Sequence, residues 1–260
     1  MSETDEAMNV LFVGAHPDDI EVFCGGTAAR YAQEGHRLFF CVATNGNIGS
    51  PTHSMDEIAA IRRGEAQRGA DLVGAELIWL DFDDEFLLDT RESRLKFIEA
   101  FRIARPDVVF CHWNDDYNPD HSISGRLVED CISMAKIPLI ETGHEPTGRI
   151  PPVYHMDTPA GVNFVPEVYV DITETFARKV EMVRQHESQQ VWMTDLFGYD
   201  LEAFLEIPAR FRGLQAGCPL AEAFRPSYRW GRMLRQHHLP GCLGVAPHLQ
   251  GSGKESFKNP

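Results

Sequence analysis

The chain has 260 residues, 43% of them hydrophobic, and this length is typical of one α/β domain with a substantial core. Its 39 acidic and 24 basic residues give a formal net charge of −15. Such a surface repels polyphosphates, which excludes nucleic acid as an expected partner. The six cysteines form no CxxC pair and have no regular spacing, which argues against a disulfide scaffold and predicts reduced, mostly buried thiols.

Apolar runs alternate with helical patterns through the first half of the chain. Strands are predicted at residues 9–14, 37–44, 76–82 and 107–112, and helices at residues 26–33, 55–73 and 93–103. This alternation predicts a Rossmann-like α/β fold, in which a mostly parallel sheet has helices on both faces.

The second half adds a small C-terminal extension of strands and helices. From about Pro151 the sequence predicts two further short strands, one of them at residues 152–156, a helix at residues 173–189 and a short helical stretch from Leu201. No internal repeat or linker marks a second domain, so residues 1–240 are expected to form one domain. Residues 241–260, rich in Gly, Ser, Pro and Lys, are expected to be a mobile tail or to make oligomer contacts.

Polar side chains with metal-binding chemistry follow the first predicted strand. His16, Asp18 and Asp19 come directly after a continuous hydrophobic run at residues 9–13. Ligands bind at the carboxyl ends of strands in open α/β sheets, and Pro17 biases His16 away from helical geometry. Imidazole and carboxylate are common ligands of catalytic zinc, so His16 and Asp19 are candidate ligands. Asp18 is then free to act as a general base on a metal-bound water.

A second polar stretch follows the fourth predicted strand and offers a third ligand. Residues 112–121 end in Asp120 and His121. Because two strand ends of one sheet can meet, His16, Asp19 and His121 are expected around one Zn²⁺ ion. Helix N-capping is the alternative interpretation of both stretches, since Asp18 or Asp19 precedes a helical segment starting near residue 20. The pairing of the two stretches is what favours a metal site.

Several motifs then carry a resemblance to a known family. They are His16-Pro17-Asp18-Asp19, Gly25-Gly26-Thr27 and Asn118-Pro119-Asp120-His121, supported by Thr44-Asn45-Gly46, Ile61 to Glu65, Val168 to Ile172, Lys179, His186 to Gln189 and Ala221-Glu222-Ala223-Phe224. Over roughly residues 8–230 the chain resembles the PIG-L/LmbE family of zinc-dependent N-acetylglucosaminyl deacetylases. The resemblance implies one Zn²⁺ per chain on His16, Asp19 and His121, with Asp18 as the base.

The second motif departs from the family pattern at one position. Members usually have His-Pro-Asp-His, where this chain has Asn118 in the first position. The resemblance places Asn118 and Asp120 among the catalytic residues. An asparagine donates a hydrogen bond to an oxyanion but delivers no proton at neutral pH. The leaving amine is therefore expected to be protonated by Asp18, which returns the proton that it took from water, or by another donor. Candidate donors are Tyr117, His112 and His155.

Substrate-binding residues are expected on the loops near the strand ends. Arg62 either pairs with Glu65 along its helix or, as the resemblance suggests, reaches the active site. Asn45 either contacts sugar hydroxyls or turns the chain. His155, on the strand at residues 152–156, is either a satisfied core histidine or part of the site. Cys24 lies near the metal loop, where packing is favoured over zinc ligation.

Two further side chains, His186 and Gln189, also have two interpretations. They lie one turn apart on the helix predicted at residues 173–189. They either line the pocket or anchor that helix against the sheet, and the anchoring role is favoured.

The function implied by the resemblance is hydrolysis of the N-acetyl group of an amino sugar, free or in a small glycoconjugate, releasing acetate and an amine. One alternative is an amidase acting on a thiol conjugate or on another acyl amide. Another is a sugar or nucleotide binder without catalysis, although Gly14 to Asp19 lacks the Gly-x-Gly-x-x-Gly motif of a phosphate loop.

Location and assembly are expected from simpler features. Residues 1–8 are acidic, with no hydrophobic stretch before the first strand, so a cytoplasmic protein without a membrane partner is expected. The resemblance also implies a homo-oligomer, a trimer or a hexamer.

Overall fold

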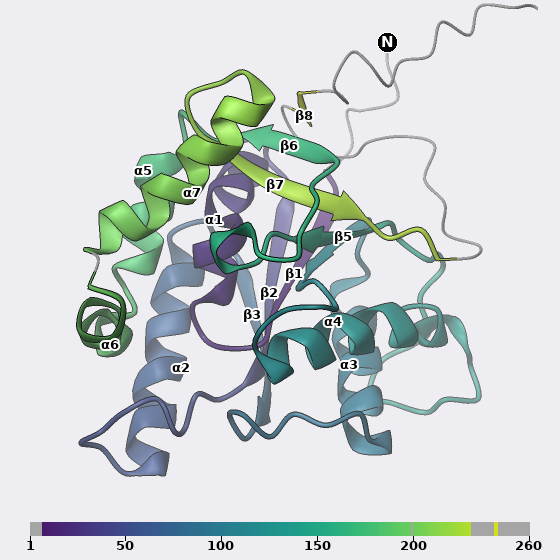
Figure 1. The fold of residues 1–260 in the computed structure, drawn as a ribbon. Coiled ribbons are helices and arrows are strands. Elements are labelled where there is room, and N and C mark those ends of the chain that lie inside the picture. The colour runs from purple at the N-terminus through teal and green to yellow at the C-terminus, as the bar shows by residue number, and fades with distance from the viewer. Residues whose placement is uncertain (1–6, 199, 230–241, 244–260) are drawn as a thin grey trace, which may run out of the picture.

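The computed structural model describes residues 7–198, 200–229 and 242–243, and its centre is a twisted mixed sheet (Figure 1). The strands are β1 Asn9–Gly14, β2 Arg37–Thr44, β3 Glu76–Phe82, β4 Val108–Cys111, β5 Val153–Met156, β6 Val168–Asp171, β7 Ala221–Pro226 and β8 Cys242–Leu243. Their order across the sheet is β3-β2-β1-β4-β5-β7-β6-β8. Strands β1 to β5 pair in parallel, whereas β7 is antiparallel to both β5 and β6.

Helices cover both faces of the sheet, as the alternating sequence pattern predicts. They are α1 Asp19–Gln33, α2 Met55–Asp71, α3 Arg91–Ala104, α4 Pro119–Cys131, α5 Phe176–Val183, α6 Glu187–Phe197 and α7 Leu201–Ala216, with short 3-10 turns η1 Met134–Lys136 and η2 Pro159–Gly161. Side chains alternate along β1, so that Val10 and Phe12 pack with α1, α2, α5 and α7. Leu11 and Val13 pack on the opposite face with α3 and α4.

Local sequence explains where three of the helices begin. Ser54 and Glu57 form a reciprocal capping box at the start of α2. Thr90 and Ser93 form the same arrangement before α3. Asn118 caps α4 by accepting hydrogen bonds from two backbone N–H groups, with Pro119 in the first turn.

Helix α1 is interrupted near its start, and the interruption gives the backbone N–H groups of the Gly25-Gly26-Thr27 motif a partner outside the helix. Cys24 has non-helical angles, with φ −145° and ψ 20°. The N–H groups of Gly26 and Thr27 beyond it donate to the Glu222 carboxylate at 3.0 and 2.7 Å. The same carboxylate pairs with Lys179 Nζ at 2.7 Å. Residues from three distant motifs therefore meet at one buried carboxylate.

Two expectations for the second half are corrected. The helix predicted at residues 173–189 is two helices, because α5 ends at Val183 and α6 begins at Glu187. The short helical stretch predicted from Leu201 is a full helix of 16 residues. The tail predicted at residues 241–260 lies outside the described residues, apart from β8. No helix in the described part of the chain combines the length and the apolar character needed to cross a membrane.

Candidate metal centre

The carboxyl ends of β1 and β4 meet at the point where the strand order of the sheet reverses. Strands β2 and β3 lie on one side of β1, and β4 pairs with its other edge. Ligand sites in open α/β sheets lie at this kind of switch point. The loop after β1 contributes His16, Asp18 and Asp19, and the loop and helix after β4 contribute His121. The structure thus brings together two segments about a hundred residues apart.

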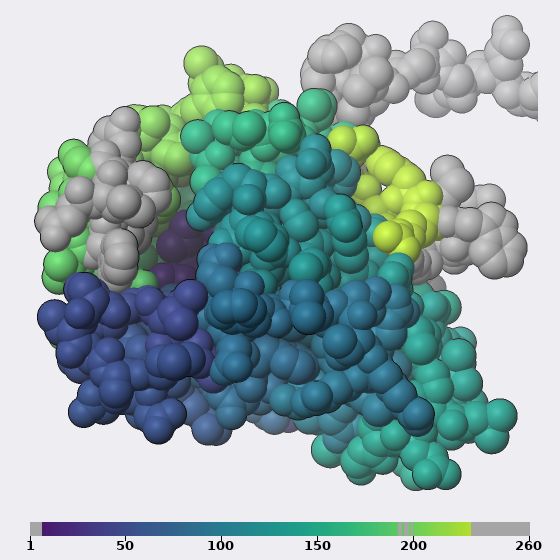
Figure 2. Space-filling model, turned by 60° about the horizontal axis from the view of Figure 1, so that its bottom comes forward, coloured from purple at the N-terminus to yellow at the C-terminus, as the bar shows by residue number. Residues whose placement is uncertain are grey.

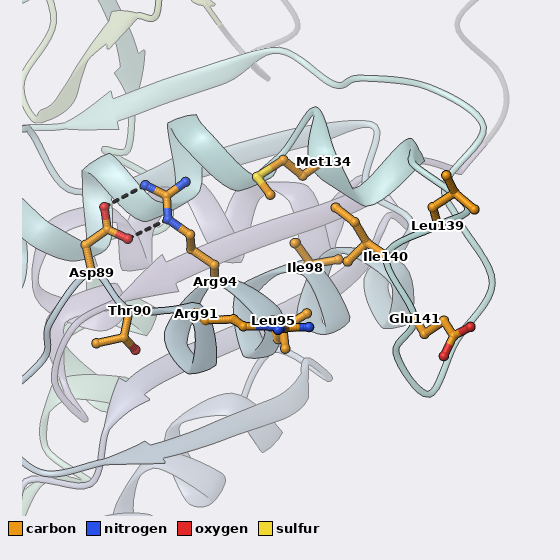
Figure 3. A pocket seen from close by; sticks show the side chains of 10 residues that line it. All are labelled: Asp89, Thr90, Arg91, Arg94, Leu95, Ile98, Met134, Leu139, Ile140 and Glu141. Carbon is orange, nitrogen blue, oxygen red and sulfur yellow. Dashed lines mark hydrogen bonds and ion pairs between the residues drawn. The ribbon is translucent and has the colours of Figure 1, made fainter.

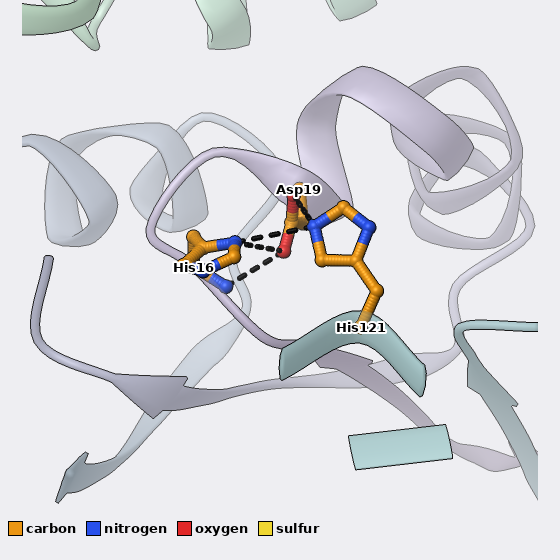
Figure 4. A group of neighbouring side chains, drawn as sticks. All are labelled: His16, Asp19 and His121. Carbon is orange, nitrogen blue, oxygen red and sulfur yellow. Dashed lines mark hydrogen bonds and ion pairs between the residues drawn. The ribbon is translucent and has the colours of Figure 1, made fainter. Parts of the chain in front are cut away.

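Three side chains point toward one centre (Figure 4). His16 Nδ1 lies 3.2 Å from His121 Nε2 and 3.4 Å from an Asp19 carboxylate oxygen. His121 Nε2 lies 3.3 Å from the other Asp19 oxygen. A tetrahedral ion with bonds of about 2.0 to 2.1 Å keeps its donor atoms about 3.4 Å apart. The two imidazole nitrogens and the Asp19 carboxylate therefore lie close enough for three residues to hold a tetrahedral metal that keeps one further position.

The charges around this centre also fit a cation. Burial lowers the pKa of His16 and His121, but Asp19 and neighbouring carboxylates outweigh it, so that the pKa of His16 is well above its usual range and that of His121 is about 9. Burial raises the pKa of Asp19, and the three histidines around it bring that pKa well below its usual value. Two protonated imidazoles would repel each other at 3.2 Å. A bound cation supplies the same positive charge without that repulsion.

Each metal-facing imidazole has a carboxylate on its other nitrogen. Asp116 Oδ1 lies 3.1 Å from His121 Nδ1, and Asp84 Oδ1 lies 3.1 Å from His16 Nε2. Carboxylates in this position fix the orientation and tautomer of metal-binding histidines. Asp84 was not picked out from the sequence, although it follows the end of β3 as Asp18 and Asp19 follow β1. Asp116 lay inside the stretch quoted above but had no assigned role.

Asp18 lies beside the three candidate ligands with a strained backbone. Its φ is 134°, which is rare for any residue except glycine. It occupies the N-cap position of α1 without a capping hydrogen bond from its side chain, so capping does not explain it. Burial raises the pKa of Asp18 to about 6, against the opposing charge of Arg62. This carboxylate is therefore held at the metal centre rather than used to start the helix.

Arg62 reaches the centre instead of pairing with Glu65. Its guanidinium donates to Pro17 O at 3.0 Å and lies 3.5 Å from Asp18 Oδ2. Glu65 accepts hydrogen bonds from Ser188 on α6. Of the two interpretations left open by the sequence, the pairing with Glu65 is not seen, and Arg62 lines the cleft around this centre. It also contacts the loop that carries Asp18, a role that the sequence did not suggest.

The candidate metal ligands, Asp18 and Arg62 line a cleft of about 680 Å³. Figure 2 shows the hollow, with the N-terminal segment at its bottom between the α2 segment and the later part of the chain. His16, Asp18, Asp19, Arg62, Asn118, His121 and Gln189 all line it. Asn118 Nδ2 donates to Glu85 Oε1 at 2.9 Å on its wall.

Three predicted site residues lie outside the cleft. His155 is buried between the His112 carbonyl and Glu129, at 2.8 and 3.1 Å. Asn45 turns its own loop, accepting from Asn47 N and donating to Asp81. Asp120 accepts from the N–H groups of Glu85 and Leu87, and its Oδ2 lies 3.5 Å from His16 Nε2, so it lies behind the candidate ligand and holds the wall of the cleft.

Other sequence alternatives are also resolved by position. His112 is fully buried and stacks on His121, with ring centroids 3.9 Å apart, and its Nε2 lies 3.0 Å from Asp19 Oδ2. Tyr117 lines the cleft and is exposed. Cys24 is buried with its thiol against Met156, in agreement with the packing role. His186 lies 3.2 Å from Glu21 on α1, so it anchors its helix, whereas Gln189 faces the cleft.

A second hollow, of about 650 Å³, lies between α3 and the segment after η1 (Figure 3). Its charged groups include Arg94, which is paired with Asp89 at 2.6 Å. The described residues that line it include neither histidine nor cysteine. The metal-type chemistry is therefore concentrated at the first cleft.

Comparison with known proteins agrees with this geometry. Residues 11–132 match the model of the PIG-L family, described as GlcNAc-PI de-N-acetylase. A diacetylchitobiose deacetylase of Thermococcus kodakarensis is 30% identical over 232 residues, covering 85% of this chain and 84% of the relative. The chain belongs to the PIG-L family. The metal-type cluster and Asp18 thus lie in a PIG-L enzyme fold.

Solved structures and other relatives show both the likeness and the range of the PIG-L family. The N,N'-diacetylchitobiose deacetylase from Pyrococcus horikoshii superposes with a TM-score of 0.75 at 28% identity, covering 85% of this chain and 84% of that one. A 4-oxalmesaconate hydratase of Pseudomonas putida is 24% identical and covers 70% of this chain and 74% of its own. PIG-L relatives therefore include deacetylases and a hydratase.

Proposed function

We propose that this protein is a zinc-dependent hydrolase that removes the N-acetyl group from an N-acetylglucosamine-type sugar or a small glycoconjugate. The observation that carries the proposal is the spacing of 3.2 to 3.4 Å among the donor atoms of His16, Asp19 and His121, with Asp18 in the same cleft. The deacetylase names of its relatives support the substrate class.

In this proposal His16, Asp19 and His121 hold the zinc ion. When bound, the ion polarises a carbonyl oxygen and brings the pKa of a water down to about 7. Asp18 takes the proton of the attacking water, and Arg62 keeps the Asp18 carboxylate turned toward the cleft.

The departing amine needs a proton, and the oxyanion needs a donor. Asp18 returns the proton it has taken to the amine nitrogen. The Asn118 amide has two N–H groups, of which Glu85 receives one at 2.9 Å. The other N–H stabilises the oxyanion without transferring a proton. This arrangement replaces the histidine that the family usually has at position 118.

The proposal is tested by metal analysis of the purified protein together with acetate release from N-acetylglucosamine, its methyl glycoside and diacetylchitobiose. We expect about one zinc per chain and acetate release that a chelator abolishes. Asp18→Asn should keep the metal and lose at least about a hundredfold in kcat, the range expected for a lost general base. His121→Ala should lose both metal and activity. Asp56→Asn, on the exposed start of α2, is the matched control.

A second candidate, addition of water to an unsaturated acid, is favoured by the hydratase relative. The cleft favours the first candidate, because Arg62 is its one arginine or lysine among the described lining residues and is already paired with Asp18 and Asp84. A carboxylate substrate would meet mostly negative charge there. Zinc without acetate release from any of the three sugars, and with hydration of an unsaturated dicarboxylate, would establish the second candidate instead.

A further inference from the structure

An apolar pocket that the proposed reaction does not use lies beside the metal cleft. It has a volume of about 420 Å³ and lies between α1, α7 and the segment around η2. Ligand pockets for small molecules begin at about 300 Å³ and are lined mostly by apolar side chains. The pocket is thus large enough to receive part of a ligand.

The pocket is continuous with the metal cleft. Five residues line both, namely Val22, Phe23, Thr158, Pro159 and Phe204. The Phe23 ring meets the His121 ring edge to face, with centroids 6.0 Å apart. One aromatic ring therefore separates the pocket from a candidate metal ligand. A substrate with its amide at the metal centre can therefore extend a neighbouring group past Phe23 into this pocket.

The wall of the pocket is suited to an apolar group. Leu205 and Ala209 of α7 contribute buried aliphatic surface, at 3% and 4% exposure. The charged groups at its border are already paired: Arg212 donates to Asp157 at 2.5 and 3.0 Å. Lys179 pairs with Glu222 at 2.7 Å. These charged groups are neutralised by ion pairs within the protein, so a ligand in the pocket makes mainly apolar contacts with its wall.

We propose that this pocket binds an alkyl or aryl group that the substrate carries beside its N-acylated sugar. The inference rests on the proposed function, and it adds a substrate class to it: amphiphilic glycosides or N-acyl sugars rather than the bare monosaccharide. The polar cleft holds the sugar and the reacting amide. The apolar pocket then takes the neighbouring group out of water, which favours binding in proportion to the area buried.

Two substrate series test the inference and distinguish the position of the apolar group. The first has methyl, propyl and hexyl β-glycosides of N-acetylglucosamine. The second has acetyl, butanoyl and hexanoyl amides of methyl glucosaminide. We expect kcat/KM to rise about threefold to fourfold per methylene in one series, as for a buried methylene. A rise in the first assigns the pocket to the aglycone, and a rise in the second assigns it to the acyl chain. No rise in either, with acetate still released, overturns the inference alone.

Variants locate the effect in the pocket. Ala209→Phe should reduce the hexyl-to-methyl ratio of kcat/KM to about one, because its ring occupies the space. Ala203→Phe, half-buried in the same wall, serves if the first variant does not fold. Leu214→Phe is the matched control, because Leu214 is 81% exposed on the same helix outside the pocket. An equal reduction of the ratio in the control would contradict the assignment.

A binding measurement separates this inference from the proposed function. Calorimetric titration with hexyl and methyl β-glucosides measures the affinity of the pocket for an alkyl group without turnover. Tighter binding of the hexyl glucoside, lost in Ala209→Phe, supports the pocket even if acetate release fails. Equal affinities for the two glucosides, in a protein that deacetylates N-acetylglucosamine, would support the proposed function and overturn the assignment of the pocket to an apolar group.

Discussion

Asp116 Oδ1 lies 3.1 Å from His121 Nδ1, while His121 Nε2 on the opposite side of the ring faces Asp19 at 3.3 Å. The imidazole is therefore held between a carboxylate that orients it and the candidate metal centre. The Asp116 side chain is almost fully buried, so its negative charge acts on the ring with little screening by solvent.

Asp116→Ala should weaken zinc binding by about tenfold to a hundredfold, the usual effect of removing a carboxylate behind a metal-binding histidine. Asp116→Asn should weaken it less, because an amide oxygen would still face His121 Nδ1. Competition with a chelator of known affinity measures the change. Asp115→Ala, at the exposed neighbouring position, is the control, and an equal loss in that variant would argue against an orienting role.

His155→Gln should remove a pH dependence of stability above neutral pH. Both ring nitrogens face acceptors, the His112 carbonyl and Glu129, and although burial lowers the pKa of His155, Cys111 and Glu129 raise it to about 10. Because the folded pKa is above the unfolded value of about 6.5, the stabilisation is complete below that pH and is lost as pH rises toward 10. The free energy of unfolding should fall by up to about 1.4 kcal/mol per pH unit in this window.

Urea unfolding at pH 7, 8 and 9 measures that slope. His144→Gln is the matched control, since it makes the same substitution at an exposed position. A slope that persists in His155→Gln would mean that other groups produce it.

Glu222→Ala should destabilise the protein by about 3 to 5 kcal/mol, the usual cost of breaking a buried ion pair. It leaves the Lys179 ammonium buried without its partner and also removes the acceptor for the N–H groups of Gly26 and Thr27. Denaturant unfolding gives the value. Glu206→Ala, which breaks an exposed pair with Arg210, should cost less than about 1 kcal/mol. Equal losses in the two variants would show that burial is not the deciding factor.

Gly26→Ala should destabilise by about 1 to 3 kcal/mol, as overpacking does. A Cβ at this position would lie 2.7 Å from Cβ and Cγ2 of Ile172, which cannot move freely inside the core. Gly64→Ala is the opposite case, because its Cβ would meet only Arg68 Nη1 at 3.7 Å on a partly exposed helix surface. Helix propensity predicts a gain of up to about 1 kcal/mol there. Thermal unfolding of both variants should therefore shift in opposite directions.

The alternating strands and helices, and the two strand ends that meet, were predictable from local patterns. A hydrophobic run followed by His16, Asp18 and Asp19 indicates the end of a buried strand, and parallel strands bring such ends to one edge of the sheet. The division between α5 and α6 was not predictable, because the helical pattern continues through residues 184–186. The chain turns there where His186 packs against Glu21 of α1.

Local sequence is enough to predict which kinds of side chain follow the ends of β1 and β4, since strand length and hydrophobic pattern are local properties. The pairing of groups that are distant in the chain follows from the packed fold. In the folded protein Arg62 pairs with Asp18 instead of Glu65, and His155 pairs with Glu129. The carboxylates of Asp84 and Asp116 lie next to the outer nitrogens of His16 and His121. These pairings depend on packing between elements that are far apart in the chain, where burial makes each polar group take the partner that is within reach.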